Sequence, residues 1–271
     1  MAAASPIPCT VAVLTKNSGA TLPRALESVQ AFAELLVCDG GSTDGTLEIA
    51  RAAGARIITQ DPKYLGGDGR IIDFAGVRNQ TLEAATQPWF FFLDSDEYVN
   101  EALVDHVRSA VTDSPCDAYV VLRRYVYNGQ EIDCAYSYPN RSMRLFRKST
   151  ARAFIKKIHE RISLNDGARI GTIAGALLVP VDPDIQLGRQ KGDRYIKLQV
   201  AQAGDFSWHT LFQATGSTLR ASLSYGLRTL RSLLWCRGNR LPLVFDWEAQ
   251  VYNARLIKAY WAAKLRQYRS S

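Results

Sequence analysis

The segment WFFFLDSDEYV, residues 89–99, decides the fold class, because five apolar residues run directly into an acidic turn. A continuous apolar run of this length is typical of a strand that is buried on both faces of a sheet. The acidic residues Asp94, Asp96 and Glu97 follow where that strand should end. Open α/β sheets bind their ligands at the carboxyl ends of their strands, so we expect a ligand crevice here.

The residues before this segment alternate short apolar runs with amphipathic stretches, which predicts βαβ units around a mostly parallel sheet. Three further strands are expected at residues 10–15, 34–38 and 55–59. Helices are expected where apolar residues recur at helical spacing, at residues 22–32, 46–53 and 71–85. Residues 60–70 contain a proline and three glycines, which predicts a loop.

Beyond residue 117 the sequence predicts strands with little helix between them, at residues 118–127, 143–147, 158–164 and 170–179. From residue 188 onward two apolar stripes predict a helical extension. The stripes consist of Leu219, Leu223, Leu227, Leu230 and Leu234, and of Trp247, Val251, Ala254, Trp261 and Leu265. We therefore predict an α/β fold, a mixed sheet flanked by helices, with a main domain at residues 1–188 and a helical C-terminal region at residues 189–271.

Charge is distributed unevenly along the chain. The formal net charge is +7, and residues 189–271 hold 14 Lys and Arg against 4 Asp and Glu. Such asymmetry indicates either a solvated basic face or a local anionic partner. No nucleic-acid-binding motif accompanies it, so nucleic acid is not an expected partner. We expect peripheral contact of the C-terminal helices with a membrane surface.

The five cysteines and the N-terminus bear on the cellular compartment. The spacings of the cysteines match neither a redox pair nor a zinc pattern, so reduced thiols are expected. The N-terminus lacks the charged start and long apolar run of a secretory signal, and no stretch of about 18 apolar residues predicts a membrane span. The sequence therefore predicts a cytoplasmic protein, placed at the inner face of the cell membrane if its C-terminal helices bind there.

Two motifs suggest nucleotide chemistry. Asp94 and Asp96 lie at an expected strand end, where two carboxylates can hold Mg²⁺ or Mn²⁺ against a diphosphate. Residues 39–45, DGGSTDG, follow another expected strand and can present backbone N–H groups and a carboxylate to a nucleotide. Each motif alone is also compatible with a solvated turn. The glycine-rich patterns of dinucleotide-binding and P-loop proteins are absent from the sequence.

The order and spacing of several segments resemble the family 2 glycosyltransferases, which have the GT-A fold, a Rossmann-like nucleotide-binding architecture. The similar segments are VAVLTKN (11–17), LLVCDGGSTDGTLEIARAAGARI (35–57), GVRNQTLEAA (76–85) and WFFFLDSDEYV (89–99). MRLFRKS (143–149) and KIHERI (157–162) resemble the subgroup that extends lipopolysaccharide cores and related envelope glycans. The resemblance implies a nucleotide-sugar donor, with a UDP-sugar as the expected one, and a divalent cation, Mg²⁺ or Mn²⁺.

The resemblance also implies roles for residues in the first two strands and the turns after them. Thr15, Lys16 and Asn17 are expected against the nucleoside, and Asp39 is expected to hydrogen-bond the base or the ribose. The alternative for Lys16 is an ordinary surface charge.

A second group of residues is expected around the sugar diphosphate. Arg78 and Asn79 match the basic-Asn pair of the family, while Asp94 and Asp96 match the motif that contacts the ribose and the metal. The alternatives are a surface charge for Arg78 and a polar helix face for Asn79.

Catalysis is expected from the loop at residues 157–162. Glu160 matches the position of the acidic general base, and His159 is expected to orient it or to contact the metal. The implied reaction is an inverting transfer of a sugar to a hydroxyl of a glycan or lipid-linked acceptor in envelope polysaccharide or lipopolysaccharide biosynthesis. The alternatives are a nucleotidyltransferase that makes nucleotide-sugars, and a catalytically silent GT-A scaffold, a binding protein that keeps the fold without turnover.

Overall fold

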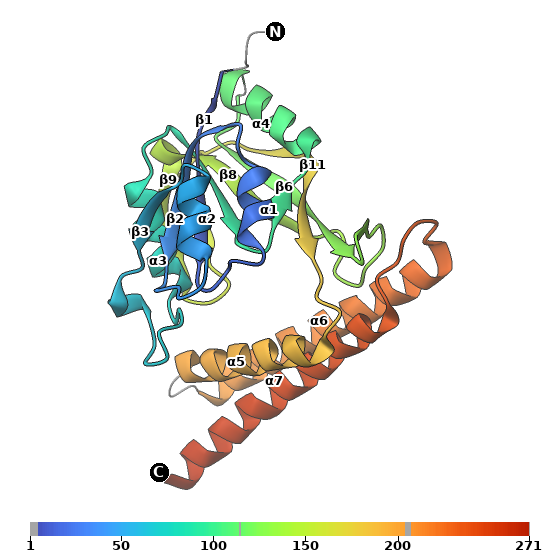
Figure 1. The fold of residues 1–271 in the computed structure, drawn as a ribbon. Helices are drawn as coiled ribbons and strands as arrows, with labels where there is room; N and C mark the ends of the chain where they lie inside the picture. Colours follow the sequence, from blue (N-terminus) through green and yellow to red (C-terminus); the bar gives the residue numbers. More distant parts are fainter. Residues whose placement is uncertain (1–4, 114, 204–206, 271) are drawn as a thin grey trace. The chain divides into compact units, whose positions relative to one another are not determined.

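A computed structural model describes residues 5–113, 115–203 and 207–270 of the chain (Figure 1). It shows two compact units. The first unit is formed by the chain up to Arg124 and by Asn140–Pro180, and the second by Tyr125–Pro139 and the chain from Val181 onward. The domain boundary predicted between residues 188 and 189 stays a prediction. The compact units divide after Pro180, and the segment Tyr125–Pro139, here called the hairpin, belongs to the second unit.

The first unit is built on a mixed sheet, whose main path among the described residues is β3-β2-β1-β4-β8-β6-β11-β5. A ninth strand, β7, lies in the second unit and pairs with Val126 and Tyr127 at the end of β6. Four strands run parallel at one side: β1 (Ile7–Thr15), β2 (Phe32–Asp39), β3 (Arg56–Thr59) and β4 (Trp89–Asp94). The others are β5 (Tyr98–Val99), β6 (Ala118–Tyr127), β7 (Gln130–Glu131), β8 (Arg141–Arg147) and β11 (Ile170–Pro180). A separate antiparallel pair consists of β9 (Ala151–Ile155) and β10 (Arg161–Leu164).

Strand register brings the predicted site residues to one edge of the sheet. Thr15 pairs with Asp39, and Leu14 pairs with Asp94, so the carboxyl ends of β1, β2 and β4 lie together. The apolar run of β4 is buried as predicted, and its alternate side chains pack on opposite faces of the sheet. Trp89, Phe91 and Leu93 face one core and Phe90 and Phe92 the other.

Helices cover both faces of the sheet. Three helices, α1 (Leu22–Glu27), α2 (Thr46–Ala52) and α4 (Glu101–Asp113), contribute to the first core. On the other face, α3 (Phe74–Ala84) packs together with β9. The predicted helix at residues 22–32 is too long, because α1 ends at Glu27 and Phe32 is already the first residue of β2. Phe32 is buried as part of the strand, so its helical spacing from the apolar residues of α1 is a coincidence.

The second unit is helical, with α5 (Ile185–Ala203), α6 (Trp208–Trp235) and α7 (Leu243–Ser270) following the hairpin. Helix α7 packs against both α5 and α6. No helix in the described ranges is long and apolar enough to cross a membrane. The α/β class, with a mixed sheet flanked by helices and a C-terminal helical extension, is confirmed.

The expectation of five reduced cysteines is wrong for two of them. Cys134 in the hairpin and Cys236 at the end of α6 form a disulfide, while Cys9, Cys38 and Cys116 form none among the described residues. The two bonded residues are 102 positions apart in the chain. The two cysteines meet because the chain after α6 runs back along the hairpin. The spacing of cysteines in the sequence gives no sign of this contact.

Candidate functional site

The turn after β2 is held by Asp39. Its carboxylate is buried and accepts hydrogen bonds from the Thr15 hydroxyl at 2.8 Å, from the backbone N–H groups of Gly41 and Ser42 at 2.9 and 2.8 Å, and from the Ser42 hydroxyl at 2.5 Å. Both carboxylate oxygens are therefore engaged within the protein. Asp39 fixes the shape of the glycine-rich turn, and its predicted contact with a base or ribose stays a prediction.

The turn after β1 interlocks with the same glycine-rich segment. Asn17 has a φ of 51° and receives a hydrogen bond from the Thr43 backbone N–H at 2.8 Å, while its own N–H donates to the Ser42 hydroxyl at 2.8 Å. The Lys16 ammonium donates to the Gly69 carbonyl in the loop before α3. Lys16 and Asn17 thus connect three loops at the carboxyl edge of the sheet.

Asn79 does not join this group. Its side-chain amide donates to the Phe154 carbonyl at 3.0 Å and accepts from the Phe154 N–H at 2.7 Å. Both ends of the amide are used to attach α3 to β9. Its expected place near the sugar diphosphate stays a prediction, and the structure gives it a bracing role.

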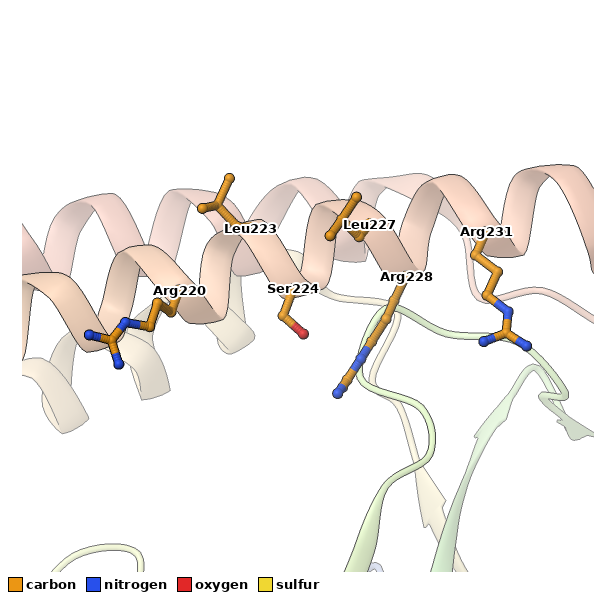
Figure 2. A pocket seen from close by; sticks show the side chains of 6 residues that line it. All are labelled: Arg220, Leu223, Ser224, Leu227, Arg228 and Arg231. Carbon is orange, nitrogen blue, oxygen red and sulfur yellow. The ribbon is translucent and has the colours of Figure 1, made fainter.

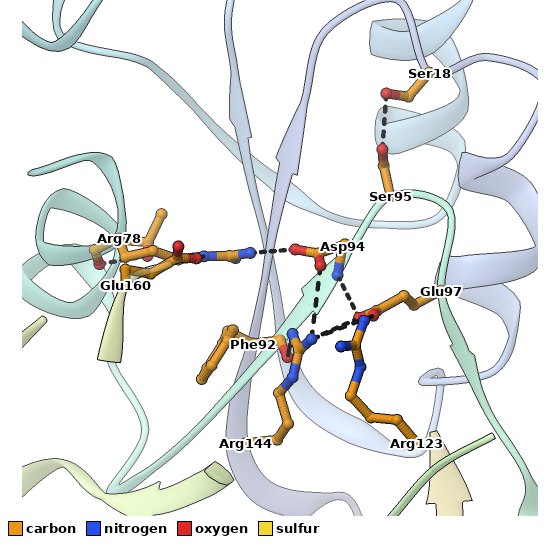
Figure 3. Close-up of polar contacts among 10 residues, drawn as sticks. Ser18, Arg78, Phe92, Asp94, Ser95, Glu97, Arg123, Arg144 and Glu160 are labelled. Carbon is orange, nitrogen blue, oxygen red and sulfur yellow. Dashed lines mark hydrogen bonds and ion pairs between the residues drawn. The ribbon is translucent and has the colours of Figure 1, made fainter. Parts of the chain in front are cut away.

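Arg78 connects the two acidic positions that the sequence singled out (Figure 3). Its side chain comes from α3, is 2% exposed, and stacks on the Phe92 ring with 4.8 Å between the guanidinium carbon and the ring centre. Nη2 pairs with Asp94 Oδ1, and Nε lies 3.5 Å from Glu160 Oε1. Nη1 is buried without a hydrogen-bond partner among the described residues. The alternative of Arg78 as a surface charge is wrong.

A buried ion-pair network lies beneath Asp94. Glu97 has a 1% exposed side chain and pairs with Arg123 at 2.5 Å and with Arg144 at 3.2 Å. Arg144 also lies 3.6 Å from Asp94 Oδ2 and stacks on the Phe92 ring at 4.5 Å. Both oxygens of Asp94 therefore face a guanidinium group, one from Arg78 and one from Arg144 (Figure 3).

These arginines set the charge of Asp94. Burial raises the pKa of its carboxyl group, but the positive charges of Arg144, Arg78 and Arg123 outweigh this effect and hold the pKa at about 2. Asp94 is consequently ionised at neutral pH. Burial also raises the pKa of Glu97, which the charge of Arg144 opposes.

The remaining predicted residues lie on loops. Asp96 is exposed in the turn between β4 and β5, next to Ser95, whose hydroxyl accepts a 3.0 Å hydrogen bond from Ser18. His159 is exposed with a φ of 54° in the loop between β9 and β10, and Glu160 follows it with a 17% exposed side chain. The structure thus brings Arg78, Asp94 and Glu160 together.

The side chains around Asp94 offer few ligands for a divalent cation. The described residues include no group of three or more His, Cys, Asp or Glu side chains that could hold a metal by themselves. The protein offers the exposed carboxylate of Asp96 beside Asp94, whose charge is shared with two arginines. One or two carboxylates fit an ion such as Mg²⁺ that takes its other ligands from substrate phosphates and water.

Sequence reasoning missed Arg123 and Arg144. Both lie on strands after the acidic turn, in β6 and β8. Arg144 has the same parity as Phe146 in β8, and both are buried. An arginine in phase with a buried aromatic residue on a strand was the available signal, because such a charge needs an acidic partner.

Comparison with known proteins places these observations in a family. The family model described as "Glycosyl transferase family 2" matches residues 10–169, which is more than half of the chain. The chain is 34% identical over 151 residues to a TPR repeat-containing protein of Synechococcus elongatus, covering 55% of this chain and 34% of that protein. It is 30% identical over 166 residues to the lipopolysaccharide core biosynthesis glycosyltransferase LpsC of Rhizobium meliloti, covering 58% of this chain and 57% of LpsC.

A solved structure is also similar. The crystal structure of S. aureus TarS 1-349 in complex with UDP matches with a TM-score of 0.43 and 15% identity, covering 97% of this chain and 92% of that chain. The chain spans about a third and just over half of the lengths of the two curated relatives, respectively. Since the family model covers both the Asp94 turn and the Glu160 loop, the chain belongs to glycosyl transferase family 2.

Proposed function

We propose that this protein is an inverting, metal-dependent glycosyltransferase that moves a sugar from a nucleotide-sugar to a hydroxyl group. The observation that supports this most is the cluster of Asp94, Arg78 and Glu160 at the carboxyl edge of the parallel strands. An ionised carboxylate, a buried cation and a second, accessible carboxylate from another loop meet there. Family membership makes sugar transfer the reaction that this cluster would serve.

The roles follow from the position of each group. Glu160 is the general base: it takes the proton of the acceptor hydroxyl as the oxygen forms a bond to the anomeric carbon and the bond to the diphosphate oxygen breaks. Arg78 holds Glu160 through Nε and has its unpartnered Nη1 available for a phosphate or sugar oxygen of the donor. Such a buried donor without a partner favours a ligand at this position.

Asp96 is the residue we assign to the divalent cation, Mg²⁺ or Mn²⁺, with Asp94 beside it. The cation would supply electrostatic stabilisation of the leaving diphosphate. Asp96 is exposed and lies two residues beyond Asp94, in the turn at the carboxyl end of β4. Asp94 itself is held in an ionised form that can accept hydrogen bonds from the donor ribose.

The substrates are proposed from the relatives. A UDP-sugar is the proposed donor, and TarS, a similar structure, has been solved with UDP. LpsC is named for lipopolysaccharide core biosynthesis, and we propose a glycan or lipid-linked acceptor in envelope polysaccharide or lipopolysaccharide synthesis. Peripheral contact of the second unit with the inner face of the cell membrane belongs to the same proposal, because a lipid-linked acceptor would be presented there; the cytoplasmic location stays a prediction.

A ligand and turnover panel tests the proposal. Purified protein is incubated with UDP-, GDP-, CMP- and dTDP-sugars, with and without Mn²⁺ or Mg²⁺, and thermal stability and sugar hydrolysis or transfer are measured. One donor should raise the melting temperature, and Asp96→Ala should abolish the metal dependence of this effect. Glu160→Gln should bind the donor normally and lose about 10²- to 10⁴-fold in turnover.

The matched control is Glu101→Gln, which makes the same change at an exposed position in the first turn of α4. It should behave as wild type. If no nucleotide-sugar stabilises the protein under any condition, the proposed function is wrong. If a donor binds but Glu160→Gln turns over as wild type, the assignment of the base is wrong.

A further inference from the structure

Helix α6 presents three different faces along its length. One face packs inside the second unit: Leu211 and Thr218 are buried, and the Ser222 hydroxyl accepts a 2.9 Å hydrogen bond from Asn253 in α7. The Thr229 hydroxyl on the same face donates to Asp246. The side chains on the other two faces of α6 are exposed or partly exposed.

The second face is a row of exposed leucines. Its members recur at spacings of three and four and therefore share one side of the helix: Leu219, Leu223, Leu227, Leu230 and Leu234. Their exposures range from 51% to 69%. Exposed apolar rows of this extent mark interaction or membrane surfaces more often than plain solvent-facing helices.

The third face is a row of arginines beside the leucines. Together with two members of the leucine row they line a shallow hollow of about 430 Å³, whose lining residues are Arg220, Leu223, Ser224, Leu227, Arg228 and Arg231 (Figure 2). In Figure 2 the two leucines point to one side of the helix, and the arginines and the serine point to the other.

The charge of this arginine row is not matched within the described parts of the chain. Arg228 donates weakly to the Ser137 carbonyl at 3.4 Å, and in residues 5–113, 115–203 and 207–270 no carboxylate forms an ion pair with Arg220, Arg228 or Arg231. Helix α6 contains no Asp or Glu at all. A row of cations without acidic neighbours is complementary to an anionic partner.

We propose that this surface of α6, the leucine row with the arginine row beside it, binds an anionic lipid surface with the helix lying in the plane of the membrane interface. The leucines enter the boundary between headgroups and acyl chains, and the arginines contact lipid phosphates. Helix α6 is not apolar enough to span a membrane, which is consistent with an interfacial position. The inference deepens the proposed membrane contact by naming its face, and it does not depend on the sugar-transfer chemistry.

Vesicle co-sedimentation with the full chain tests the inference. Wild type should bind mixed phosphatidylglycerol–phosphatidylcholine vesicles at moderate salt and bind pure phosphatidylcholine vesicles much less. Arg220→Gln with Arg231→Gln should weaken binding to the mixed vesicles about 25-fold, because each basic residue near an anionic surface contributes about fivefold. Leu223→Gln with Leu227→Gln should weaken binding to them at least about tenfold.

A control variant and a second readout separate the outcomes. Arg51→Gln with Arg152→Gln removes the same charge from exposed positions of the first unit and should bind vesicles as wild type. Every variant should keep the melting-temperature increase with the donor found for wild type, so a misfolded variant is recognised by its loss. A protein that responds to no donor but binds vesicles as expected would refute the proposed function and leave this inference standing.

Three outcomes would overturn the inference. The first is an absence of wild-type binding to anionic vesicles. The second is equal weakening by the control and by the α6 arginine variant. The third is a wild-type dimer in light scattering that Leu223→Gln with Leu227→Gln converts to monomer without any change in vesicle binding, which would make the leucine row a protein interface.

Discussion

Glu34 in β2 supports a quantitative prediction about the stability of the sheet. Its carboxylate accepts hydrogen bonds from the Thr10 hydroxyl in β1, from the Thr86 N–H and hydroxyl, both at 2.8 Å, and from Arg56 in β3, with Nη2 at 2.6 Å and Nε at 3.1 Å. One side chain thus joins β1, β2, β3 and the segment before β4. Burial raises the pKa of Glu34, but these hydrogen bonds lower it from 4.5 to about 2.

Glu34→Gln removes the charge and one acceptor oxygen while keeping the size of the side chain. The lowered pKa corresponds to at most about 3 kcal/mol of stabilisation at neutral pH. The Arg56 side chain is 43% exposed, so solvent screening reduces the expected loss to about 2 kcal/mol. Because the folded-state pKa lies below the unfolded one, this contribution is complete above about pH 5 and disappears as the pH falls toward about 2.

Urea unfolding at about pH 7 and about pH 3 measures the effect. The free energy of unfolding should differ between wild type and Glu34→Gln by about 2 kcal/mol at the higher pH and by less than about half of that at the lower pH. Glu48→Gln is the control, since Glu48 is 72% exposed and lies 3.7 Å from Arg51; it should change stability by less than about 0.5 kcal/mol. A Glu34→Gln loss that is the same at both pH values would refute the reasoning.

Three further predictions concern other parts of the chain. Replacing Cys134 and Cys236 by serine removes the link across 102 positions and should destabilise the second unit by about 2–4 kcal/mol in calorimetry; reduction of wild type should reproduce this shift. Arg78→Lys keeps the positive charge but loses the planar guanidinium that contacts Asp94 through Nη2 and Glu160 through Nε, so kcat/KM should fall about 100-fold in the transfer assay while donor binding remains measurable. Gly175 has a φ of 88°, and a Cβ there would lie 2.4 Å from the Leu103 backbone nitrogen; Gly175→Ala should cost about 2–4 kcal/mol in urea unfolding, and a cost below about 1 kcal/mol would contradict this close approach of β11 to α4.

The parallel half of the sheet was predictable from local pattern. Strands β1, β2 and β4 are buried on both faces, so their sequences are continuous apolar runs that end at polar turns. The placement of Asp94 and Arg78 at one edge then follows from the rule that parallel strands end together. Glu160 joined them through family resemblance, because no local pattern reports a contact between residues 82 positions apart.

Other features were not predicted. Helix α4 was missed although its buried residues recur at helical spacing, so a local signal for it was present. Strand β9 has only five residues, of which Phe154 is buried and Ile155 exposed, and this is too short for a clear period. The Cys134–Cys236 disulfide depends on a tertiary contact that no local pattern reports, and the acidic partner of Arg144 is likewise known only from the structure.

The membership of the hairpin in the second unit has a consequence for transplanting the C-terminal helices between enzymes. Ile132 and Ala135 in the hairpin pack with Leu241, and Tyr125, Tyr127 and Phe245 surround them. A chain shortened after residue 188 would keep the hairpin but lose Leu241, Phe245 and the disulfide partner of Cys134. The unit to transfer is therefore discontinuous in sequence and consists of the hairpin and the C-terminal helices. A chimera that exchanged only the helices would pack the hairpin of one parent against the helices of the other.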